Sequence, residues 1–229
     1  TVVVSVVDSE DPHFVNNPFS VYLDQNGEAD VIPFHNDTCG IGSILRSLSV
    51  ADCRDIAFNP HTVTVRVEDN HGNFQSGDVM VTIVDNLAAN MTVQNASVSL
   101  GASGTGSIMT SDVLVSSADN CGVALEVVDR NSFTCSDVGE VAVVVTVMDV
   151  NGNNASETTF VSVSDSVSPS VSVESVLMVQ LNSSGFAEIS TSDVDTGTSD
   201  ACGIASLSLN QTLFGCGDAG MIFFVEMTA

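Results

Sequence analysis

Acidic residues gather at three places along this chain, and carboxylates grouped in this way could bind a divalent cation. Each group combines the aspartate that ends one strand-rich segment with acidic residues of the segment that follows. The groups are Asp8, Glu10, Asp11, Asp37 and Asp69; Asp85, Asp119 and Asp149; and Asp165 and Asp200. Calcium binds about six to eight hard oxygens in flexible geometry. The sequence therefore predicts structural calcium at three junctions, with Asn120 or Asn151 as a neutral ligand at the second.

A second interpretation of the same residues is purely structural. Asp and Asn often occupy turns because their side chains hydrogen-bond the nearby backbone. No spacing here matches the strict loop of an EF-hand. Without an ion, the grouped carboxylates would repel one another and loosen each junction. The sequence alone leaves both interpretations open.

Six cysteines form three pairs with one spacing, because a Cys-Gly step is followed by a second cysteine fourteen positions after the first. None has the Cys-x-x-Cys spacing of zinc or redox sites. A strand and its return between the two cysteines would allow a hairpin disulfide, which is worth roughly 3 kcal/mol in the chain-entropy model. The predicted bonds are Cys39–Cys53, Cys121–Cys135 and Cys202–Cys216. Disulfides persist in oxidising compartments, so we expect a secreted or cell-surface protein.

Alternating hydrophobicity predicts β-strands along most of the chain. The stretch "HTVTVRVED" places Val63, Val65 and Val67 on one face, and "VAVVVTVMD" repeats the pattern with Val143, Val145 and Val147. Such alternation is typical of half-buried antiparallel strands. "DNHGN" and "DVNGN" have the composition of hairpin turns. No segment has a capped helical period, so the predicted fold is all-β, built from immunoglobulin-like β-sandwich repeats of about 80 residues, each with one internal disulfide.

The repeats set the expected domain boundaries. Cys39 and Cys121 are 82 residues apart, and Cys121 and Cys202 are 81 apart. We expect a final strand of a preceding repeat at 1–8, repeats at 9–86 and 87–166, and an incomplete repeat without its final strand at 167–229. A segment taken from a longer array of tandem repeats would have these boundaries. So would a subunit whose first strand completes the last repeat of its neighbour by strand exchange.

The charge balance excludes several partners. The chain has 29 acidic residues against four arginines and no lysine, which gives a net charge of −25. Such a charge argues against nucleic acid and against anionic membrane surfaces. No run of apolar residues is long enough to span a membrane, so we expect no membrane insertion.

Other functional residues give weaker signals. The four histidines, His13, His35, His61 and His71, match no zinc pattern, and no nucleophile motif is present, so we expect no enzymatic activity. A carbohydrate-binding module usually needs aromatic platforms, and this chain has no Trp and one Tyr. Candidate glycosylation sequons begin at Asn36, Asn90, Asn95, Asn154, Asn182 and Asn210.

Several motifs together carry a family resemblance. The stretches "SSGFAEISTSDVDTGTSDACGIASLSLNQTLFGC" and "FTCSDVGEVAVVVTVMDVNGNNASETTFVSVSDSVSP" resemble the hyalin-repeat-like, immunoglobulin-like modules of very large bacterial surface adhesins, especially those of Bacteroidetes, gliding adhesins included. The first repeat departs from this pattern, since Ala51 stands where the others have Phe two residues before the second cysteine. The resemblance implies a structural, adhesive segment of an extracellular stalk or filament. Its partners would be neighbouring repeats, identical subunits, or a surface glycan or cell-surface ligand. The alternative is a self-assembling fibre subunit.

Overall fold

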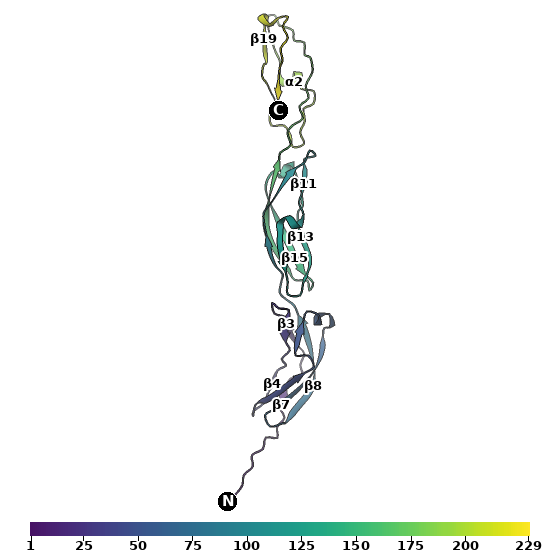
Figure 1. Ribbon diagram of the computed structural model, residues 1–229, viewed down its shortest axis with the longest axis vertical. Coiled ribbons are helices and arrows are strands. Elements are labelled where there is room, and N and C mark those ends of the chain that lie inside the picture. Colours follow the sequence, from purple (N-terminus) through teal and green to yellow (C-terminus); the bar gives the residue numbers. More distant parts are fainter. The chain divides into compact units, whose positions relative to one another are not determined.

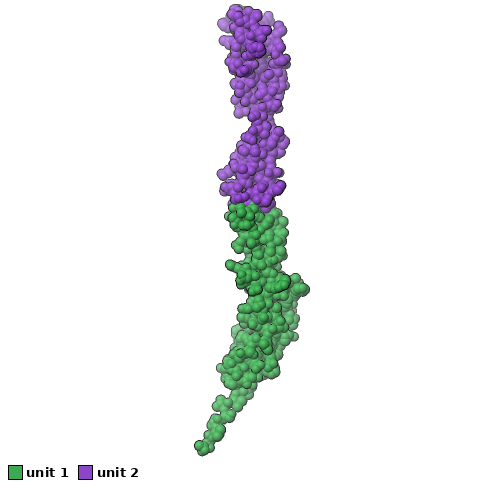
Figure 2. All heavy atoms as spheres, in the orientation of Figure 1, with its two compact units in different colours: residues 1–93, 114–127, 145–157 green, residues 94–113, 128–144, 158–229 purple.

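The computed structural model describes all 229 residues, and the chain divides into two compact units, coloured separately in Figure 2. Unit 1 comprises Thr1–Val93, Leu114–Val127 and Val145–Glu157. Unit 2 comprises Gln94–Val113, Val128–Val144 and Thr158–Ala229. Strands predominate in both, and no helix is long and apolar enough to cross a membrane.

The first repeat lies wholly in unit 1 and forms a sandwich. A four-stranded sheet has the order β2-β8-β7-β5, in which β2 runs parallel to β8. In addition, β3 pairs with β6 and β1 with β4; β3, β4, β7 and β8 are labelled in Figure 1. Its elements are β1 His13–Phe14, β2 Phe19–Tyr22, β3 Glu28–Asp30, β4 His35–Asn36, β5 Ile41–Arg46, β6 Val50–Asp52, the 3-10 helix η1 Asp55–Phe58, β7 His61–Asp69 and β8 Phe74–Val84.

The second repeat repeats this strand order, with a sheet β10-β16-β15-β13 and the pairs β11–β14 and β9–β12. Strands β15 and β16 contribute residues to both units. Its elements are β9 Asn90–Val93, β10 Ala96–Leu100, β11 Thr105–Ser107, the single-turn helix α1 Thr110–Val113, β12 Leu114–Ala118, β13 Val123–Val128, β14 Ser132–Thr134, η2 Cys135–Asp137, β15 Gly139–Asp149 and β16 Asn154–Asp165.

The third repeat, in unit 2, has only paired fragments and no four-stranded sheet. Strand β17 pairs with β19, and β18 pairs with β20. Its elements are β17 Phe186–Glu188, the single-turn helix α2 Thr191–Val194, β18 Ser208–Leu209, β19 Leu213–Gly215, η3 Cys216–Asp218 and β20 Met227–Thr228. Residues 1–8, which the sequence predicts to be a final strand, form no strand, because no neighbouring strand pairs with them.

The core confirms the alternating pattern of the long strands. Val63, Val65 and Val67 of β7 are buried, and so are the equivalent valines of β15, whereas the residues between them are exposed or half-buried. In the first repeat these valines pack with Val31 and Ala51, which come from the segments around β3 and β6. Burial of both sheet faces against each other confirms the prediction of an all-β fold of immunoglobulin-like sandwiches.

Both predicted hairpin turns are present. In each, the N–H of the turn aspartate donates to the carbonyl of the closing asparagine at 3.0 Å, Asp69 to Asn73 and Asp149 to Asn153. Gly72 and Gly152 both have φ of 94°, a conformation that glycine adopts without strain. The turns therefore form as their composition indicates.

The predicted pairing of the cysteines is wrong. The structure has the disulfides Cys53–Cys121 and Cys135–Cys202, each of which joins one repeat to the next. Cys39 and Cys216 are exposed free thiols. None of the predicted bonds Cys39–Cys53, Cys121–Cys135 and Cys202–Cys216 forms.

The reason is the path of the chain between the two cysteines of a repeat. After β5 the chain crosses to the other sheet as β6, so the two strands form no hairpin. Cys39 lies beside the β7–β8 turn, where Asn70 N–H donates to Gly40 O at 3.2 Å, whereas Cys53 lies beside Gly27 in the β2–β3 turn. A six-residue strand such as β5 spans roughly 20 Å. A disulfide tolerates a Cα–Cα distance of only about 7 Å.

Candidate calcium junctions

The second junction, in unit 1, brings together all three predicted aspartates. Carboxylate oxygens of Asp85, Asp119 and Asp149 lie within 4.8 Å of one another. Asp85 is 7% exposed and Asp149 is 1% exposed, so two of the three carboxylates are shielded from water. Such a group of carboxylates is strongly disfavoured unless a cation or hydrogen-bond donors compensate the charge.

Both oxygens of Asp149 accept hydrogen bonds. Oδ1 accepts the N–H groups of Asn151 and Asn153, both at 2.8 Å, and Oδ2 accepts the Asn153 side-chain amide at 2.8 Å. The same amide nitrogen lies 3.3 Å from the carbonyl of Asp85. Asn153 therefore ties the hairpin turn to the residue at which the chain leaves the first repeat.

Asp85 and Asn120 keep oxygen atoms without partners. Asp85 Oδ1 accepts from the N–H of Leu87 at 3.2 Å and from the amide of Asn120 at 3.4 Å. Asp85 Oδ2 and Asn120 Oδ1 are buried and accept no hydrogen bond. Buried oxygens without donors are costly. Together with Asp119, they form a set of oxygen ligands of the kind that calcium prefers.

The first junction has the same framework. Asp69 Oδ1 accepts from the N–H groups of His71 (2.7 Å) and Asn73 (2.9 Å), and Asn73 Nδ2 donates to Asp69 Oδ2 and, at 3.4 Å, to the carbonyl of Asp8. Burial works against ionisation of Asp69, but these hydrogen bonds outweigh it and hold the pKa of the carboxyl below its usual value. The turn thus stabilises a charged Asp69 beside Asp8.

Asp8 contacts two titratable side chains. Its Oδ2 lies 3.2 Å from His71 Nδ1, within ion-pair distance for a protonated ring, yet it accepts no hydrogen bond of good geometry. Oxygens of Asp8 and Asp37 also lie within 4.8 Å of the Cys39 sulfur. A hydrogen bond with Asp8 and its negative charge raise the pKa of the Cys39 thiol. Asp8 thus belongs to one group with Asp69 and His71 and to a second group with Asp37 and Cys39.

Two predicted ligands do not join this cluster. Glu10 and Asp11 are exposed, and Glu10 instead donates its backbone N–H to Asp8 Oδ1 at 3.2 Å. Their sequence positions suggested ligands because they follow Asp8, but neither residue belongs to the groups of clustered side chains that contain Asp37 or Asp69.

The third junction, in unit 2, has two carboxylates. Oxygens of Asp165 and Asp200 lie within 4.8 Å of each other and of the Cys202 sulfur. That sulfur belongs to the disulfide with Cys135 and is no thiolate ligand. Asp200 Oδ1 accepts the N–H of Cys202 at 2.7 Å, as Asp37 accepts that of Cys39 (2.8 Å) and Asp119 that of Cys121 (2.8 Å). The loop before each first cysteine is therefore built the same way in all three repeats.

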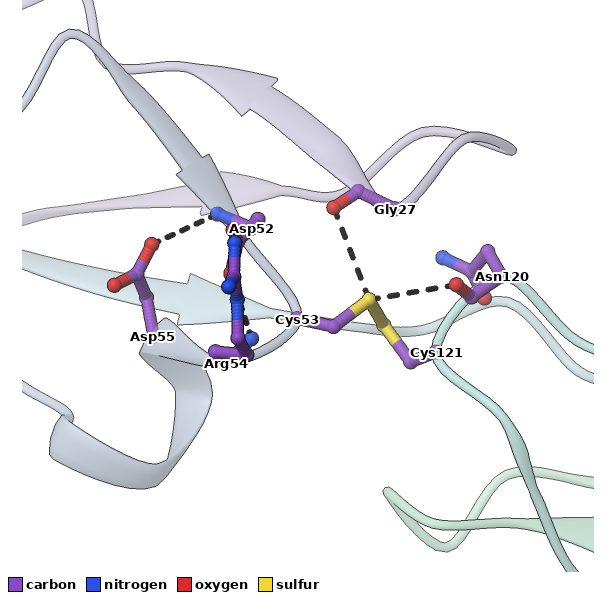
Figure 3. A network of polar contacts seen from close by, with 7 residues as sticks. All are labelled: Gly27, Asp52, Cys53, Arg54, Asp55, Asn120 and Cys121. Carbon is purple, nitrogen blue, oxygen red and sulfur yellow. Dashed lines mark hydrogen bonds and ion pairs between the residues drawn. A yellow bond between two sulfur atoms is a disulfide. The ribbon is translucent and has the colours of Figure 1, made fainter.

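A disulfide lies beside the second junction (Figure 3). Cys53 Sγ approaches the carbonyls of Gly27 (3.7 Å) and Asn120 (3.5 Å). Asn120 Nδ2 also donates to the carbonyl of Asp24 at 2.9 Å. Closing the intervening loop of 68 residues contributes about 4 kcal/mol in the chain-entropy model. Covalent and polar contacts thus hold the same junction.

The segment that carries Cys53 is fixed by charged groups (Figure 3). Asp52 Oδ2 lies 2.5 Å from Arg54 Nη2, and hydrogen bonding by Arg54 lowers the pKa of the Asp52 carboxyl. Asp55 Oδ2 accepts the N–H of Asp52 at 2.8 Å. These contacts hold the backbone on both sides of Cys53.

The other candidate residues lie apart from the junctions. His61 Nε2 lies 2.8 Å from the carbonyl of Asp55, and His35 Nδ1 lies 2.8 Å from that of Pro33. All six sequon asparagines are exposed, as glycosylation would require: Asn36, Asn90, Asn95, Asn154, Asn182 and Asn210.

Sequence reasoning missed three contributors to the junctions. Asn73 and Asn153 were expected only to shape turns, although each closes an Asp-x-x-Gly-Asn motif, and that shared final asparagine was the available signal. His71 matched no zinc pattern and was given no role at a junction. Its contact with Asp8 depends on a sequence separation of 63 residues, which no local pattern reveals.

Comparisons with known proteins add little. Neither protein-family models nor curated protein sequences match the chain. Among solved structures it is similar to human mucin-like protocadherin EC1-2 (8% identity, TM-score 0.28, 69% of this chain and 100% of that one). It is also similar to protocadherin γB7 EC1-4, with 11% identity and a TM-score of 0.28 over 87% of this chain and 63% of that one. For the protocadherin γB4 extracellular domain the identity is 12% and the TM-score 0.30, over 90% of this chain and 43% of that one. At such TM-scores these likenesses carry no argument, and the fold rests on the strand pairing described above.

Proposed function

We propose that the chain is a structural, adhesive segment of an extracellular stalk or surface filament, and that calcium and disulfides set its junctions. The observation that carries the proposal is the second junction, where the Cys53–Cys121 bond lies beside three clustered carboxylates. A catalytic role is not part of the proposal. The polar clusters recur from repeat to repeat and bind consecutive repeats together, which favours a mechanical role.

Calcium fits the atoms present at the second junction. Asp85 Oδ2 and Asn120 Oδ1 are buried without donors, and Asp119 contributes a further carboxylate. Bound calcium would neutralise the repulsion among these groups and would give the two bare oxygens a partner. Asp85, Asp119, Asp149 and Asn120 are the residues that would hold it.

The test is calorimetric titration of the full chain with calcium, together with thermal unfolding in calcium and in chelator. Extracellular calcium modules bind with dissociation constants of about 10⁻⁴–10⁻³ M. At ten times the dissociation constant, one site stabilises the folded chain by about 1.4 kcal/mol. We expect a higher unfolding midpoint in calcium, and we expect Asp85→Asn to remove most of the gain.

Asp30→Asn is the matched control, since Asp30 is exposed on β3 and outside every cluster. It should keep the full calcium response. Calcium binding that is absent, or that both variants weaken equally, would overturn the calcium part of the proposal. The carboxylates would then serve turns and solubility.

A self-assembling fibre subunit is a second candidate, and a specific observation favours it. The N-terminal valines Val2, Val3, Val4, Val6 and Val7 are 77–94% exposed. In the third repeat, Val179 is 42% exposed, whereas its counterpart in the second repeat, Val98, is 9% exposed. One copy has an exposed apolar segment, and in a neighbour's third repeat Val179 is exposed where such a segment could pair. Analytical ultracentrifugation of the full chain tests this candidate, because a strict monomer at high concentration would exclude it.

A further inference from the structure

We infer that the first junction binds a first-row transition metal ion, such as zinc, through His71, Asp8 and Asp69. One ligand atom of each residue lies within 4.8 Å of those of the other two. All three residues belong to unit 1. The inference goes beyond the proposed function, because it concerns a different ion from the calcium of the second junction and stands without it.

The imidazole of His71 sets the class of metal. Calcium takes about six to eight ligands, all of them oxygens. Imidazole nitrogen is instead a ligand of zinc, copper, iron and nickel. Zinc sites with three protein ligands are completed by a water molecule. One nitrogen and two carboxylates therefore favour a transition metal over calcium at this junction.

The distance between Asp8 and His71 matches that between two ligands of one ion. Asp8 Oδ2 lies 3.2 Å from His71 Nδ1. Two atoms that each lie about 2.0–2.1 Å from zinc in tetrahedral geometry are about 3.3–3.4 Å apart. Asp8 Oδ2 is buried and accepts no hydrogen bond, although the nitrogen is so near. The two atoms thus have the spacing of metal ligands without the geometry of a hydrogen bond.

Asp69 supplies the third ligand, and its carboxylate is held in place. The residue is 3% exposed, and its Oδ2 accepts one hydrogen bond, from Asn73 Nδ2 at 2.7 Å. An ionised carboxylate oxygen has two lone pairs, so one remains for an ion. Asp8 is oriented in the same way, since its Oδ1 accepts the N–H of Glu10 at 3.2 Å. Hydrogen bonds to the ligands are what orients them in metal sites.

An ion can reach these ligands from solvent. The His71 side chain is 51% exposed, whereas that of Asp8 is 11% exposed. The site therefore combines one accessible nitrogen with carboxylates that are shielded from water. An entry path and hydrogen-bonded ligands are both required of a metal site.

The second junction lacks the nitrogen ligand although its turn is the same. Asn151 takes the place of His71, and the N–H of each donates to the aspartate that begins the turn, at 2.8 Å for Asn151 and 2.7 Å for His71. The group at the second junction consists of carboxylates alone, from Asp85, Asp119 and Asp149. The two junctions would thus differ in metal specificity, and one side chain on a shared turn accounts for much of the difference.

The position of Asp8 is also found in the interior of the chain. Asn73 Nδ2 lies 3.4 Å from the carbonyl of Asp8, and Asn153 Nδ2 lies 3.3 Å from that of Asp85, which follows a complete repeat. The three ligands do not include the Cys39 sulfur. The site is therefore the same whether that cysteine is a thiol or part of a disulfide.

The test is calorimetric titration of the full chain with zinc chloride, in buffer with excess calcium so that sites built from oxygens alone are occupied. All samples carry Cys39→Ser and Cys216→Ser, which remove the two free thiols as zinc ligands. His71→Asn introduces the residue that the second repeat has at this position. We expect it to weaken zinc binding at least tenfold, and we expect the same of Asp8→Asn.

His13→Asn is the matched control, because His13 is exposed on β1 and outside every cluster. It should change zinc affinity less than twofold. Thermal unfolding in chelator checks that each variant is folded. Zinc binding that persists in His71→Asn, or that His13→Asn weakens equally, would overturn the inference and leave His71 and Asp8 as an ion pair.

Nuclear magnetic resonance of the histidine rings gives a second readout. One equivalent of zinc should shift the ring C–H signals of His71 and leave those of His13, His35 and His61 in place. No shift, or a shift confined to another histidine, would contradict the assignment. Because calcium is in excess throughout, a missing zinc response leaves the calcium proposal intact, and a chain that binds no calcium can still show the zinc response.

Discussion

The sulfur atoms of Cys53 and Cys121 are bonded although the two residues are 68 positions apart and belong to consecutive repeats. Cys121 follows Asp119 and Asn120 directly, so the bond lies beside the carboxylates of the second junction. The same arrangement recurs in unit 2, where Cys135 is bonded to Cys202 beside Asp165 and Asp200. Each disulfide therefore constrains a junction and not the interior of a repeat.

Gly27 should not tolerate a side chain. It has φ of +74°, and an added Cβ would lie 2.7 Å from Cys53 Sγ and 3.0 Å from the carbonyl of Asn120. Gly72 has φ of +94° with open space around it. In both glycine-to-alanine variants the alanine must adopt the left-handed backbone conformation, which costs roughly 1–2 kcal/mol. Only Gly27→Ala also adds a steric clash. Urea unfolding should show a larger loss for Gly27→Ala than for Gly72→Ala, and similar losses would argue against tight packing at this disulfide.

Asn153 should stabilise the second junction more than its neighbour does. Asn153→Ala removes the donor to Asp149 Oδ2 and to the carbonyl of Asp85. The buried acceptors then lose a partner, and we expect a loss of about 1–3 kcal/mol. Asn154→Ala, which removes an exposed donor to Gly152 O, is the control and should change little. Equal unfolding free energies for the two variants would show that the hydrogen bonds from Asn153 to Asp149 and Asp85 do not stabilise the fold.

Acid should weaken the first repeat through Asp69. The net effect of burial and its hydrogen bonds lowers the pKa of this carboxyl below the usual 3.8. A lowered folded-state pKa means that its stabilisation is present above about pH 4 and is lost as the pH falls through the folded value. Urea unfolding in chelator between pH 2 and 7 should therefore show a shallower acid decline for Asp69→Asn than for the parent chain. A steeper decline in the variant would contradict the sign of the shift.

The fold was predictable from the sequence where the signal was local. The alternation around Val65 identified a strand and its buried face, and Asp69 to Asn73 identified a hairpin turn. The repeated "TSDV" of α1 and α2 was missed, because a single helical turn held by one aspartate has no helical period.

Contacts between residues far apart in the sequence were harder to predict. The spacing of Cys39 and Cys53 was read as a hairpin, but the chain crosses between sheets there, which local patterns do not reveal. The aspartates that lie close together could be listed from the sequence because one aspartate ends each repeat and the others lie in equivalent loops. That they bind calcium stays a prediction. Glu10 and Asp11 lie outside the groups of clustered side chains, since proximity in sequence to Asp8 does not fix where a side chain lies.

The most direct measurement is a non-reducing tryptic map of the oxidised chain. The four arginines, Arg46, Arg54, Arg66 and Arg130, put Cys39 in peptide 1–46, Cys53 in 47–54, Cys121 in 67–130 and the other three cysteines in 131–229. Disulfides between consecutive repeats predict that peptide 47–54 is bonded to 67–130 through Cys53 and Cys121. Peptide 47–54 bonded to 1–46, through Cys53 and Cys39, would instead place the disulfide within a repeat and contradict the central claim.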